Sequence, residues 1–370
     1  MTDMHHVYMQ QALDLAAQGQ FSVGTNPMVG CVIVRDGDIV GRGWHERPGE
    51  PHAEVHALRE AGAAAAGATV YVTLEPCSHF GRTPPCADAL IKAQVARVVI
   101  AMQDPNPLVA GAGISRLLEA GIAVEVGVLA APAESLNRGF ISRMRRRRPW
   151  LRVKLAATLD GRTALANGVS QWITGPAARR DVHRWRAQSG AILSTARTVL
   201  ADNAKLTARH EMAEQQPLRV IIDSRQQLTP AHPFFLETAP VLLVYAGTRE
   251  DADDLHQWPD HVERCWLPAL NGRVDLNALL EELAVRGINN VWTECGPELA
   301  GALLAVGLVD ELVIYMAPKL FGSSGRSLLQ LPAFEQIEQV PELIIKDLRL
   351  VGEDIRVTAI PQVVIGETQS

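Results

Sequence analysis

Apolar residues in the first part of the chain alternate between helical spacing and short extended runs. Met4, Tyr8, Ala12 and Leu15 fall on one helical face, which predicts an N-terminal helix. A strong hairpin signal, Asp36-Gly37, separates the first two extended runs. The patterns predict helices over 52–65, 87–93 and 114–120, and strands over 31–34, 39–40, 69–74, 97–101 and 122–126. This alternation predicts an α/β layer fold.

The same alternation restarts in the second part of the chain. Helices are expected over 176–188, 276–286 and 297–305, and strands over 151–155, 191–193, 218–222, 241–244, 290–293 and 311–316. Pro176 suits the first turn of its helix, and Gly287 suits the end of another. The second part is therefore predicted to form its own α/β domain.

Five arginines lie between residues 143 and 149, at the point where the two parts meet. Runs of like charge are usually solvated, so we interpret this run as a basic linker. A contact to phosphate or nucleic acid is the alternative. We place the domain boundary within the run and expect domains over 1–146 and 147–370.

Composition narrows the class of protein. The length of 370 residues favours two domains at roughly 100–200 residues each. Hydrophobic residues make up 47% and charged residues 21%, which excludes a mostly disordered chain. The formal net charge of −6 argues against a protein that coats nucleic acid or an anionic membrane.

Location is inferred from the same composition. We find no signal peptide and no apolar stretch long enough to span a membrane. The five cysteines are sparse and odd in number, which disfavours a disulfide framework. A reducing cytoplasm is therefore expected.

A candidate metal site is formed by three residues that follow one another along the chain. His52 opens a predicted helix, Cys77 follows a predicted strand, and Cys86 comes nine positions later. One imidazole and two thiolates suit Zn²⁺ and leave the fourth tetrahedral position for water. Glu54 lies two residues from His52 and could accept the proton of that water and deliver it to a leaving amine.

Each of these residues has an ordinary structural interpretation when it is taken singly, since a lone buried cysteine is usually a core residue. Taken together, His-x-Glu followed by Pro-Cys and a second Cys matches the signature of zinc deaminases, except that the signature spaces its cysteines as Pro-Cys-x-x-Cys and this chain has a longer insert. His56 has the spacing of a second helical ligand, but we interpret it as a packing or hydrogen-bonding residue. The insert between the cysteines adds the donors His79, Arg82 and Thr83, which suit a phosphorylated small molecule.

At this point the chain resembles a known family. Residues 20–110 are similar to the deaminase half of the bifunctional riboflavin-biosynthesis deaminase–reductases, through the motifs TNPMVGC (25–31), GEPHAEVHAL (49–58), TLEPCSH (73–79), GRTPPC (81–86) and QDPNP (103–107). The resemblance implies a three-layer cytidine-deaminase fold. It also implies His52, Cys77 and Cys86 as zinc ligands, Glu54 as the proton shuttle and Asn26 in the substrate pocket.

A candidate phosphate-binding turn lies in the second part of the chain. The predicted strand at 290–293 leads through Gly296 into a helix that begins with Pro297. Free amides at a helix N-terminus attract phosphate, although an ordinary structural turn has the same pattern. The dinucleotide fingerprint Gly-x-Gly-x-x-Gly does not follow a predicted strand, which disfavours a Rossmann domain.

The second part resembles the reductase half of the same family, through KLAATLDGRT (154–163), SQWIT (170–174), VHRWRAQ (182–188), TVLADN (198–203), IIDS (221–224) and the Gly296 turn. That half is similar to dihydrofolate reductase in fold and implies NADPH as cofactor. The implied cofactor contacts are Ala156, Trp172, Thr198, Asp202, Ser224, Gly296, Pro297, Glu298, Leu299, Ala300, Gly301 and Ala302. The implied substrate contacts are Ser170, Arg186, Leu206, Arg209 and Glu294.

The chemistry of some of these residues supports their implied roles. Arg186 and Arg209 offer bidentate donors to a ribose 5-phosphate, with surface ion pairing as the alternative. Glu294 could accept from substrate hydroxyls, or it could cap the next helix. Trp172 could stack near the nicotinamide, or it could be a core residue. The stretch 207–217 is short and polar, so Arg209 is a less secure assignment than Arg186.

We therefore predict a cytoplasmic, bifunctional α/β enzyme. Its zinc domain would deaminate 2,5-diamino-6-(5-phosphoribosylamino)pyrimidin-4-one, and its second domain would use NADPH to reduce the ribosyl group of 5-amino-6-(5-phosphoribosylamino)uracil to ribityl. A homo-oligomer without nucleic-acid or membrane partners is expected. The alternatives are a nucleoside or tRNA base deaminase with a non-catalytic binding module, and a structural protein without activity whose fold is stabilised by zinc.

Overall fold

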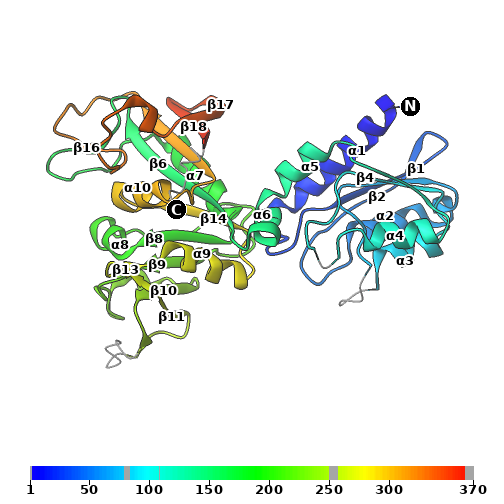
Figure 1. The fold of residues 1–370 in the computed structure, drawn as a ribbon, viewed down its shortest axis with the longest axis horizontal. Helices are drawn as coiled ribbons and strands as arrows, with labels where there is room; N and C mark the ends of the chain where they lie inside the picture. The colour runs from blue at the N-terminus through cyan, green and yellow to red at the C-terminus, as the bar shows by residue number, and fades with distance from the viewer. Residues whose placement is uncertain (1, 79–83, 108, 250–256, 363–370) are drawn as a thin grey trace. The chain divides into compact units, whose positions relative to one another are not determined.

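The computed structural model describes residues 2–78, 84–107, 109–249 and 257–362. The chain divides into two compact units, Met1–Arg148 and Pro149–Ser370 (Figure 1). Both units combine helices with sheets that contain parallel strands, so the predicted α/β fold class is confirmed. Across the described ranges, none of the helices combines the length and the hydrophobicity that crossing a bilayer requires.

The first unit contains a five-stranded sheet in the order β2-β1-β3-β4-β5. Its strands are β1 (Gly30–Arg35), β2 (Asp38–Trp44), β3 (Thr69–Val72), β4 (Arg97–Ile100) and β5 (Ala123–Val126). Strand β1 runs antiparallel to β2 and β3, whereas β3, β4 and β5 are parallel. The predicted hairpin is confirmed, because Asp36 and Gly37 have φ values of 53° and 91° and connect β1 to β2.

Two glycines allow helices to pack closely on opposite faces of this sheet. A Cβ on Gly30 of β1 would lie 1.9 Å from the carbonyl oxygen of Ala12, and one on Gly43 of β2 would lie 2.3 Å from that of Ala53. Gly30 pairs with Trp44, so the adjacent Gly43 points to the other face. Helix α1 (Thr2–Ala16) therefore covers one face and α2 (Ala53–Ala61) the other.

The remaining helices of the first unit are α3 (Cys86–Lys92), α4 (Ala112–Glu119), α5 (Ala130–Leu136) and α6 (Arg138–Arg146). The prediction of a solvated linker at 143–149 was wrong for its first residues, because α6 continues to Arg146. Arginines in the last turn of a helix interact favourably with its negative end, and Gly139 and Ser142 bury the inner face of α6. The predicted helix over 52–65 ends at Ala61, and the 3₁₀ turn Gly62–Ala65 follows it.

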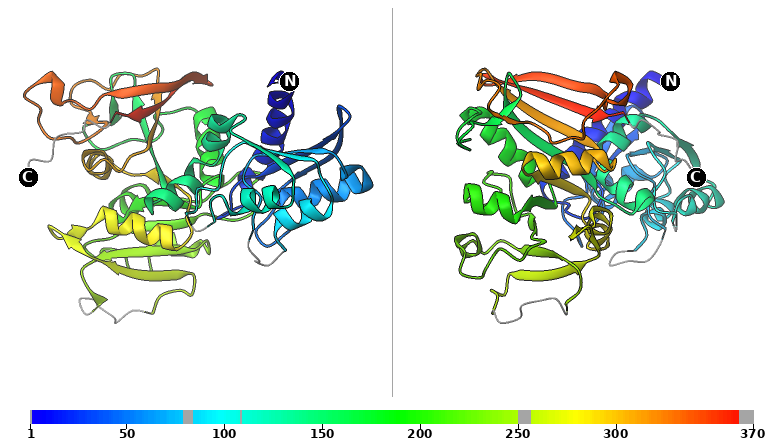
Figure 2. Two further views of the ribbon diagram at one scale, coloured as in Figure 1. Left: turned by 45° about the vertical axis from the view of Figure 1, so that its right-hand side comes forward. Right: turned by 60° about the vertical axis from the view of Figure 1, so that its left-hand side comes forward.

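The second unit contains a nine-stranded sheet in the order β11-β10-β9-β8-β14-β6-β15-β18-β17. Its strands are β6 (Trp150–Thr158), β8 (Ala191–Thr195), β9 (Leu218–Ile222), β10 (Val241–Ala246), β11 (Val262–Leu267), β14 (Asn290–Glu294), β15 (Glu311–Ala317), β17 (Leu343–Val351) and β18 (Asp354–Pro361). The seven strands from β11 to β15 are parallel to their neighbours, and the hairpin β17–β18 adds two antiparallel strands at one edge (Figure 2).

Helices cover both faces of this sheet. On strand β14, Val291 belongs to a core with α9 (Leu276–Val285) and α10 (Pro297–Ala305), whereas Trp292 belongs to a core with α7 (Pro176–Ala187) and α8 (Ala196–Asp202). Successive residues of a strand face opposite sides of the sheet, which separates these two cores.

The candidate ligand site of the second unit lies at the carboxyl ends of the central strands of the sheet. Strand β14 lies between β8 and β6, and Glu294 at its end is in register with Lys154 of β6. Helix α10 follows β14 and α8 follows β8, so both helices start at the carboxyl ends of their strands. Ligands of open α/β sheets bind outside this edge.

Candidate active sites

The three predicted metal ligands converge in the first unit. Nδ1 of His52 lies 3.5 Å from Sγ of Cys77 and 3.3 Å from Sγ of Cys86, and all three ligand atoms lie within 4.8 Å of one another. Ligands at the usual distances from a tetrahedral Zn²⁺ lie about 3.5 Å apart. The spacing and the donor set therefore fit zinc with three protein ligands.

Local structure explains why these residues meet. His52 precedes α2, and Cys86 is the first residue of α3. Cys77 follows β3, and its backbone carbonyl accepts a hydrogen bond from the amide of Ala87 at 3.2 Å. The amide of Cys86 also donates to Sγ of Cys77 at 3.3 Å, so the start of α3 fixes both thiols.

Electrostatics at this site favour anionic sulfur beside a cation. The hydrogen bond between the two thiols lowers the pKa of Cys77 and raises the pKa of Cys86, so Cys77 is the thiol that ionises first. The pKa of His52 is raised, mainly by its contact with Cys77. Burial, and then the charge of Cys77, raise the pKa of Glu54 to about 7. Glu54 is only 3% exposed in the first turn of α2, which suits a group that exchanges protons near neutral pH.

Asn26 lies near the same cluster through a residue that the sequence analysis missed. Nδ2 of Asn26 lies 2.9 Å from Nε2 of His45, and the His45 ring meets the His52 ring edge-on with centroids 5.4 Å apart. His45 follows β2 outside any recognisable metal motif, so no local signal marked it.

Glu75 is a second residue that the sequence analysis passed over. Its buried carboxylate accepts hydrogen bonds from the amides of Asp104, Gly111, Gly113 and Ile114 at 2.9–3.2 Å. It thereby fixes the loop before α4 against the strand end that leads to the metal ligand.

The other predicted features of the first unit differ in outcome. His56 lies outside the metal group and packs over Gly43 of β2, which agrees with its interpretation as a packing residue. His79, Arg82 and Thr83 of the insert lie outside the described residues.

The second unit brings Arg186 and Glu294 together as a bidentate ion pair. Nε and Nη2 of Arg186 donate to the two carboxylate oxygens at 2.5 and 2.9 Å, and Nη1 donates to the carbonyl of Thr207 at 2.9 Å. Nε1 of Trp292 donates to Oε1 of Glu294 at 2.9 Å. Burial opposes ionisation of Glu294, but Arg186 outweighs it and holds the carboxyl pKa at about 2.

Lys154 is a further charged residue at this site that the sequence analysis did not single out. Its register with Glu294 places it beside the ion pair, and its charge interacts with Glu294, Arg186 and Asp202. Burial lowers the pKa of Lys154, which favours proton donation at neutral pH.

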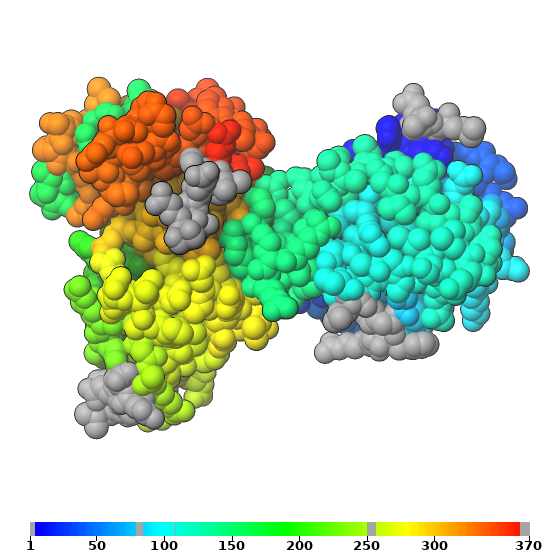
Figure 3. Space-filling model, viewed as in Figure 1, coloured from blue at the N-terminus to red at the C-terminus, as the bar shows by residue number. Residues whose placement is uncertain are grey.

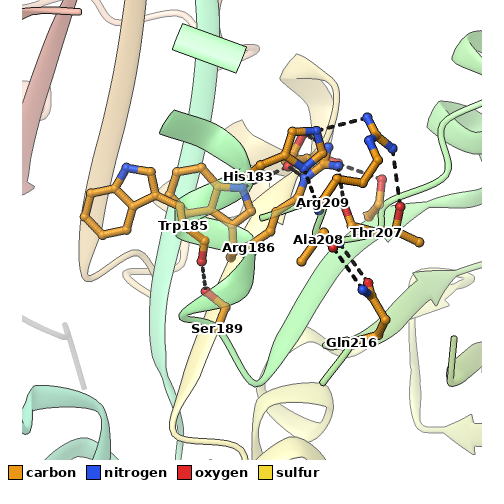
Figure 4. Close-up of polar contacts among 11 residues, drawn as sticks. His183, Trp185, Arg186, Ser189, Thr207, Ala208, Arg209 and Gln216 are labelled. Atoms are coloured by element: carbon orange, nitrogen blue, oxygen red, sulfur yellow. Dashed lines mark hydrogen bonds and ion pairs between the residues drawn. The ribbon is translucent and has the colours of Figure 1, made fainter. Parts of the chain in front are cut away.

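The loop after α8 carries two more predicted substrate residues. Leu206 is 2% exposed and packs in the hydrophobic core, so its side chain faces away from solvent. Arg209 is exposed and contacts His183 of α7 (Figure 4). Ser170 lies partly buried in the loop between β7 (Arg162–Ala164) and α7.

Several predicted cofactor residues lie at helix starts beside the strand ends. Gly296 precedes α10, and a Cβ there would meet nothing within 4 Å, so ligand atoms can approach the backbone. Thr198 lies in the first turn of α8, where its amide donates to Thr195. The open backbone at Gly296, at the start of α10, fits a phosphate-bearing dinucleotide such as NADPH, whereas the Thr198 amide is already bonded to Thr195.

Other predicted cofactor residues pack inside the fold or lie at its surface. Ala300 is buried in the core, and Gly301 packs against Gln330, whose carbonyl would lie 1.9 Å from a Cβ. Trp172 is 65% exposed, with the guanidinium of Arg179 4.7 Å from its ring, so its interpretation as a core residue is wrong.

The remaining cofactor assignments lie at the surface or are partly buried. Glu298 pairs with Arg197 and Arg273, and Ser224 accepts from the amide of Val274. The others are Ala156 in β6, Asp202 at the end of α8, and Pro297, Leu299 and Ala302 in α10.

Comparison with known proteins identifies both units. Residues 2–102 match the cytidine and deoxycytidylate deaminase zinc-binding region, and residues 149–357 match the RibD C-terminal domain. The chain is 53% identical over 360 residues to the riboflavin biosynthesis protein RibD of Escherichia coli, covering 94% of this chain and 97% of that protein. This chain belongs to the RibD family.

Two solved structures agree with this membership. Acinetobacter baumannii RibD superposes with a TM-score of 0.89 at 43% identity, covering 98% of this chain and 100% of that one. A diaminohydroxyphosphoribosylaminopyrimidine deaminase/5-amino-6-(5-phosphoribosylamino)uracil reductase from Thermotoga maritima gives a TM-score of 0.87 at 33% identity, covering 98% and 99%. The family resemblance drawn from the sequence is thereby confirmed, and the metal ligands lie within the zinc-binding region that defines the RibD N-terminal half.

Proposed function

We propose that the chain catalyses two consecutive steps of riboflavin synthesis. The first unit deaminates 2,5-diamino-6-(5-phosphoribosylamino)pyrimidin-4-one, and the second reduces the ribosyl group of 5-amino-6-(5-phosphoribosylamino)uracil to ribityl. The observation that carries this proposal is the convergence of His52, Cys77 and Cys86 beside the buried Glu54 in a chain that matches RibD proteins over nearly their full length.

In the first unit, His52, Cys77 and Cys86 would hold Zn²⁺, which would supply Lewis acidity to the attacking water. Glu54 accepts a proton from the attacking water at its carboxylate and delivers it to the departing amine. Burial raises the pKa of Glu54, which suits a group that must both accept and release a proton. The amide of Asn26, held by His45, orients the heterocycle.

In the second unit, the start of α10 would hold phosphate of NADPH, which would supply the reducing equivalents. Reduction at the anomeric carbon breaks its bond to the ring oxygen, and that oxygen needs a proton. Nζ of Lys154 is the group that we assign to this transfer, because burial favours its neutral form after donation. Glu294, fixed by Arg186 and Trp292, accepts hydrogen bonds from the sugar hydroxyls.

Partners and location follow from the same proposal. The partner is a phosphorylated pyrimidine rather than nucleic acid or a membrane surface, which the net charge of −6 supports. All five cysteines are described, and each is a free thiol, which supports the cytoplasm. The two catalytic domains, predicted over 1–146 and 147–370, correspond to the two compact units, which divide after Arg148.

A homo-oligomer is supported by the edge strand β17. Its residues Ile345, Leu348 and Leu350 are 59–72% exposed, and the orange-to-red strands of this region form part of the surface of the second unit (Figure 3). Exposed apolar residues on an edge strand favour association with another chain.

The direct test is NADPH oxidation with 5-amino-6-(5-phosphoribosylamino)uracil, followed at 340 nm. Purified protein should oxidise NADPH only when this substrate is present. The diaminopyrimidinone should support oxidation after deamination has released ammonia. Ammonia release without any NADPH oxidation would overturn the reductase half of the proposal.

A further inference from the structure

The loop that carries Arg209 is fixed at three successive residues (Figure 4). Nη1 of Arg186 donates to the carbonyl of Thr207 at 2.9 Å. The side-chain amide of Gln216 donates to the carbonyl of Ala208 and accepts from its amide, both at 2.9 Å. Arg209 then contacts His183, so the loop is attached to α7 on both sides of Ala208.

His183 meets both the backbone and the side chain of Arg209. The amide of Arg209 lies 3.1 Å from Nδ1 of His183, and Nη2 of its guanidinium lies 2.9 Å from Nε2. Nη1 of Arg209 also donates to Oγ1 of Thr207 at 3.4 Å. His183 and Arg186 are three residues apart on α7, which places both on one helical face toward this loop.

The imidazole of His183 is neutral in this surrounding. Burial, followed by the charges of Arg186 and Arg209, lowers the pKa of His183 to about 4, against the opposing effect of Glu294. A neutral imidazole has one ring nitrogen that accepts and one that donates. It therefore accepts one Arg209 donor at a time, either the backbone amide at Nδ1 or the guanidinium at Nε2.

We propose that His183 is a positioning residue that holds Arg209 ready for the phosphate of the reductase substrate. The Arg209 amide donates to Nδ1, which holds the loop on α7, and the guanidinium lies beside Nε2. When the phosphate takes the guanidinium, the bond from the amide keeps the loop attached. The inference rests on the proposed function, because it takes Arg209 as a phosphate contact.

His183→Phe tests this role, because it keeps a flat ring and removes both nitrogens. We expect the KM of the phosphorylated substrate to rise about tenfold with kcat within about threefold, as for a lost hydrogen bond to a charged group. The ratio of kcat/KM for that substrate to kcat/KM for its dephosphorylated nucleoside should fall by the same factor. His183→Asn, which restores an acceptor, should recover part of the loss.

Three controls distinguish a wrong phosphate assignment for Arg209 from a wrong role for His183. Arg184→Ala, an exposed neighbour on α7, should change nothing, and ammonia release by the first unit should be unchanged in every variant. Arg209→Ala should raise KM at least as much as His183→Phe, and the double variant should be no worse than Arg209→Ala. A normal KM for Arg209→Ala would overturn the phosphate assignment itself. A raised KM for Arg209→Ala with a normal one for His183→Phe would overturn only the role of His183.

A measurement on the unchanged protein does not depend on how the variants fold. Nitrogen-15 spectra of ring-labelled histidine should show a changed Nε2 shift of His183 when ribose 5-phosphate draws the guanidinium away from that nitrogen. Ribose, which lacks the phosphate, should leave the spectrum unchanged. An identical His183 signal with and without ribose 5-phosphate at saturating concentration would overturn the proposal.

Discussion

Nε1 of Trp292 donates a hydrogen bond to Oε1 of Glu294 over 2.9 Å. The two residues are two positions apart on β14, so they point to the same side of the sheet. Trp292 is fully buried, and its ring stacks on Trp185 with centroids 5.5 Å apart and planes inclined by 4°. A core residue thus orients the carboxylate that we assign to the substrate.

Trp292→Phe should shift the acid limb of the pH profile of the reductase to higher pH. The variant keeps an aromatic ring in the core but removes one of the hydrogen bonds that lower the pKa of Glu294. The free energy of unfolding should fall by about 1–3 kcal/mol, as for a buried hydrogen bond to a charged group. Rates measured from pH 2 to pH 8 check the limb. Trp266→Phe is the matched control, since Nε1 of Trp266 has no hydrogen-bond partner within the described part of the chain. Equal profiles for the two variants would contradict the prediction.

Arg186→Met should remove the acid-sensitive part of the stability of the second unit. The folded pKa of Glu294, about 2, lies below the ordinary value of 4.5. Its ionised form therefore stabilises the fold above about pH 4.5, and this stability is lost as the pH falls toward 2. The free energy of unfolding of the wild type should fall by roughly 3 kcal/mol across that pH window, whereas the variant should already lack this stabilisation at pH 7.

Six of the seven tryptophans lie in the second unit, so tryptophan fluorescence during urea unfolding reports on this unit. A variant as stable as the wild type at pH 7 would show that the pair contributes nothing.

Glu54→Gln should separate the two activities. The amide cannot carry the proton between water and leaving amine, so deamination should fall by a factor of about 100 or more. Zinc content and reduction of pre-deaminated substrate should be unchanged, because Gln is close in size and Glu54 is not a ligand. Ammonia release, metal analysis and NADPH oxidation measure the three outcomes. Parallel loss of both activities would argue against separate sites.

Cys86→Ser should abolish zinc binding while sparing the reductase. It removes one of the two thiolates that balance the charge of the ion, and serine is a poor substitute for soft sulfur. Bound zinc per chain and deamination should both fall close to zero. Cys265→Ser in the second unit is the control and should retain a full complement of metal. Normal zinc content in Cys86→Ser would remove Cys86 from the ligand set.

Leu348→Lys together with Leu350→Lys should weaken self-association. Both side chains project from the same face of the edge strand β17 and are 64% and 72% exposed. Charge on this face should shift the mass measured by light scattering toward that of one 40.2 kDa chain. Val285→Lys replaces an apolar residue on α9 that is more exposed than either leucine, and it should leave the mass unchanged. An unaltered oligomer in the double variant would exclude this face.

Residue chemistry and local patterning carried much of the prediction. The helix over 297–305 and the strand over 218–222 have the predicted bounds, because their glycine, proline and apolar patterns act within a few residues. The metal ligands were recognisable because few residue types bind zinc and their spacing is distinctive. In contrast, β17 and β18 were not predicted, since β17 lies at the edge with most of its apolar residues exposed and leaves no burial pattern to recognise.

Sequence alone predicted three zinc ligands, which the structure brings together, a glutamate beside them as proton carrier, and an α/β fold with most of its helices and strands. Only the tertiary structure decided that Arg186 pairs with Glu294, that His45 links Asn26 to His52, and that His183 meets Arg209. These contacts join residues from different strands, helices and loops. Their formation depends on sheet order and helix packing, which short-range patterns of hydrophobicity do not encode.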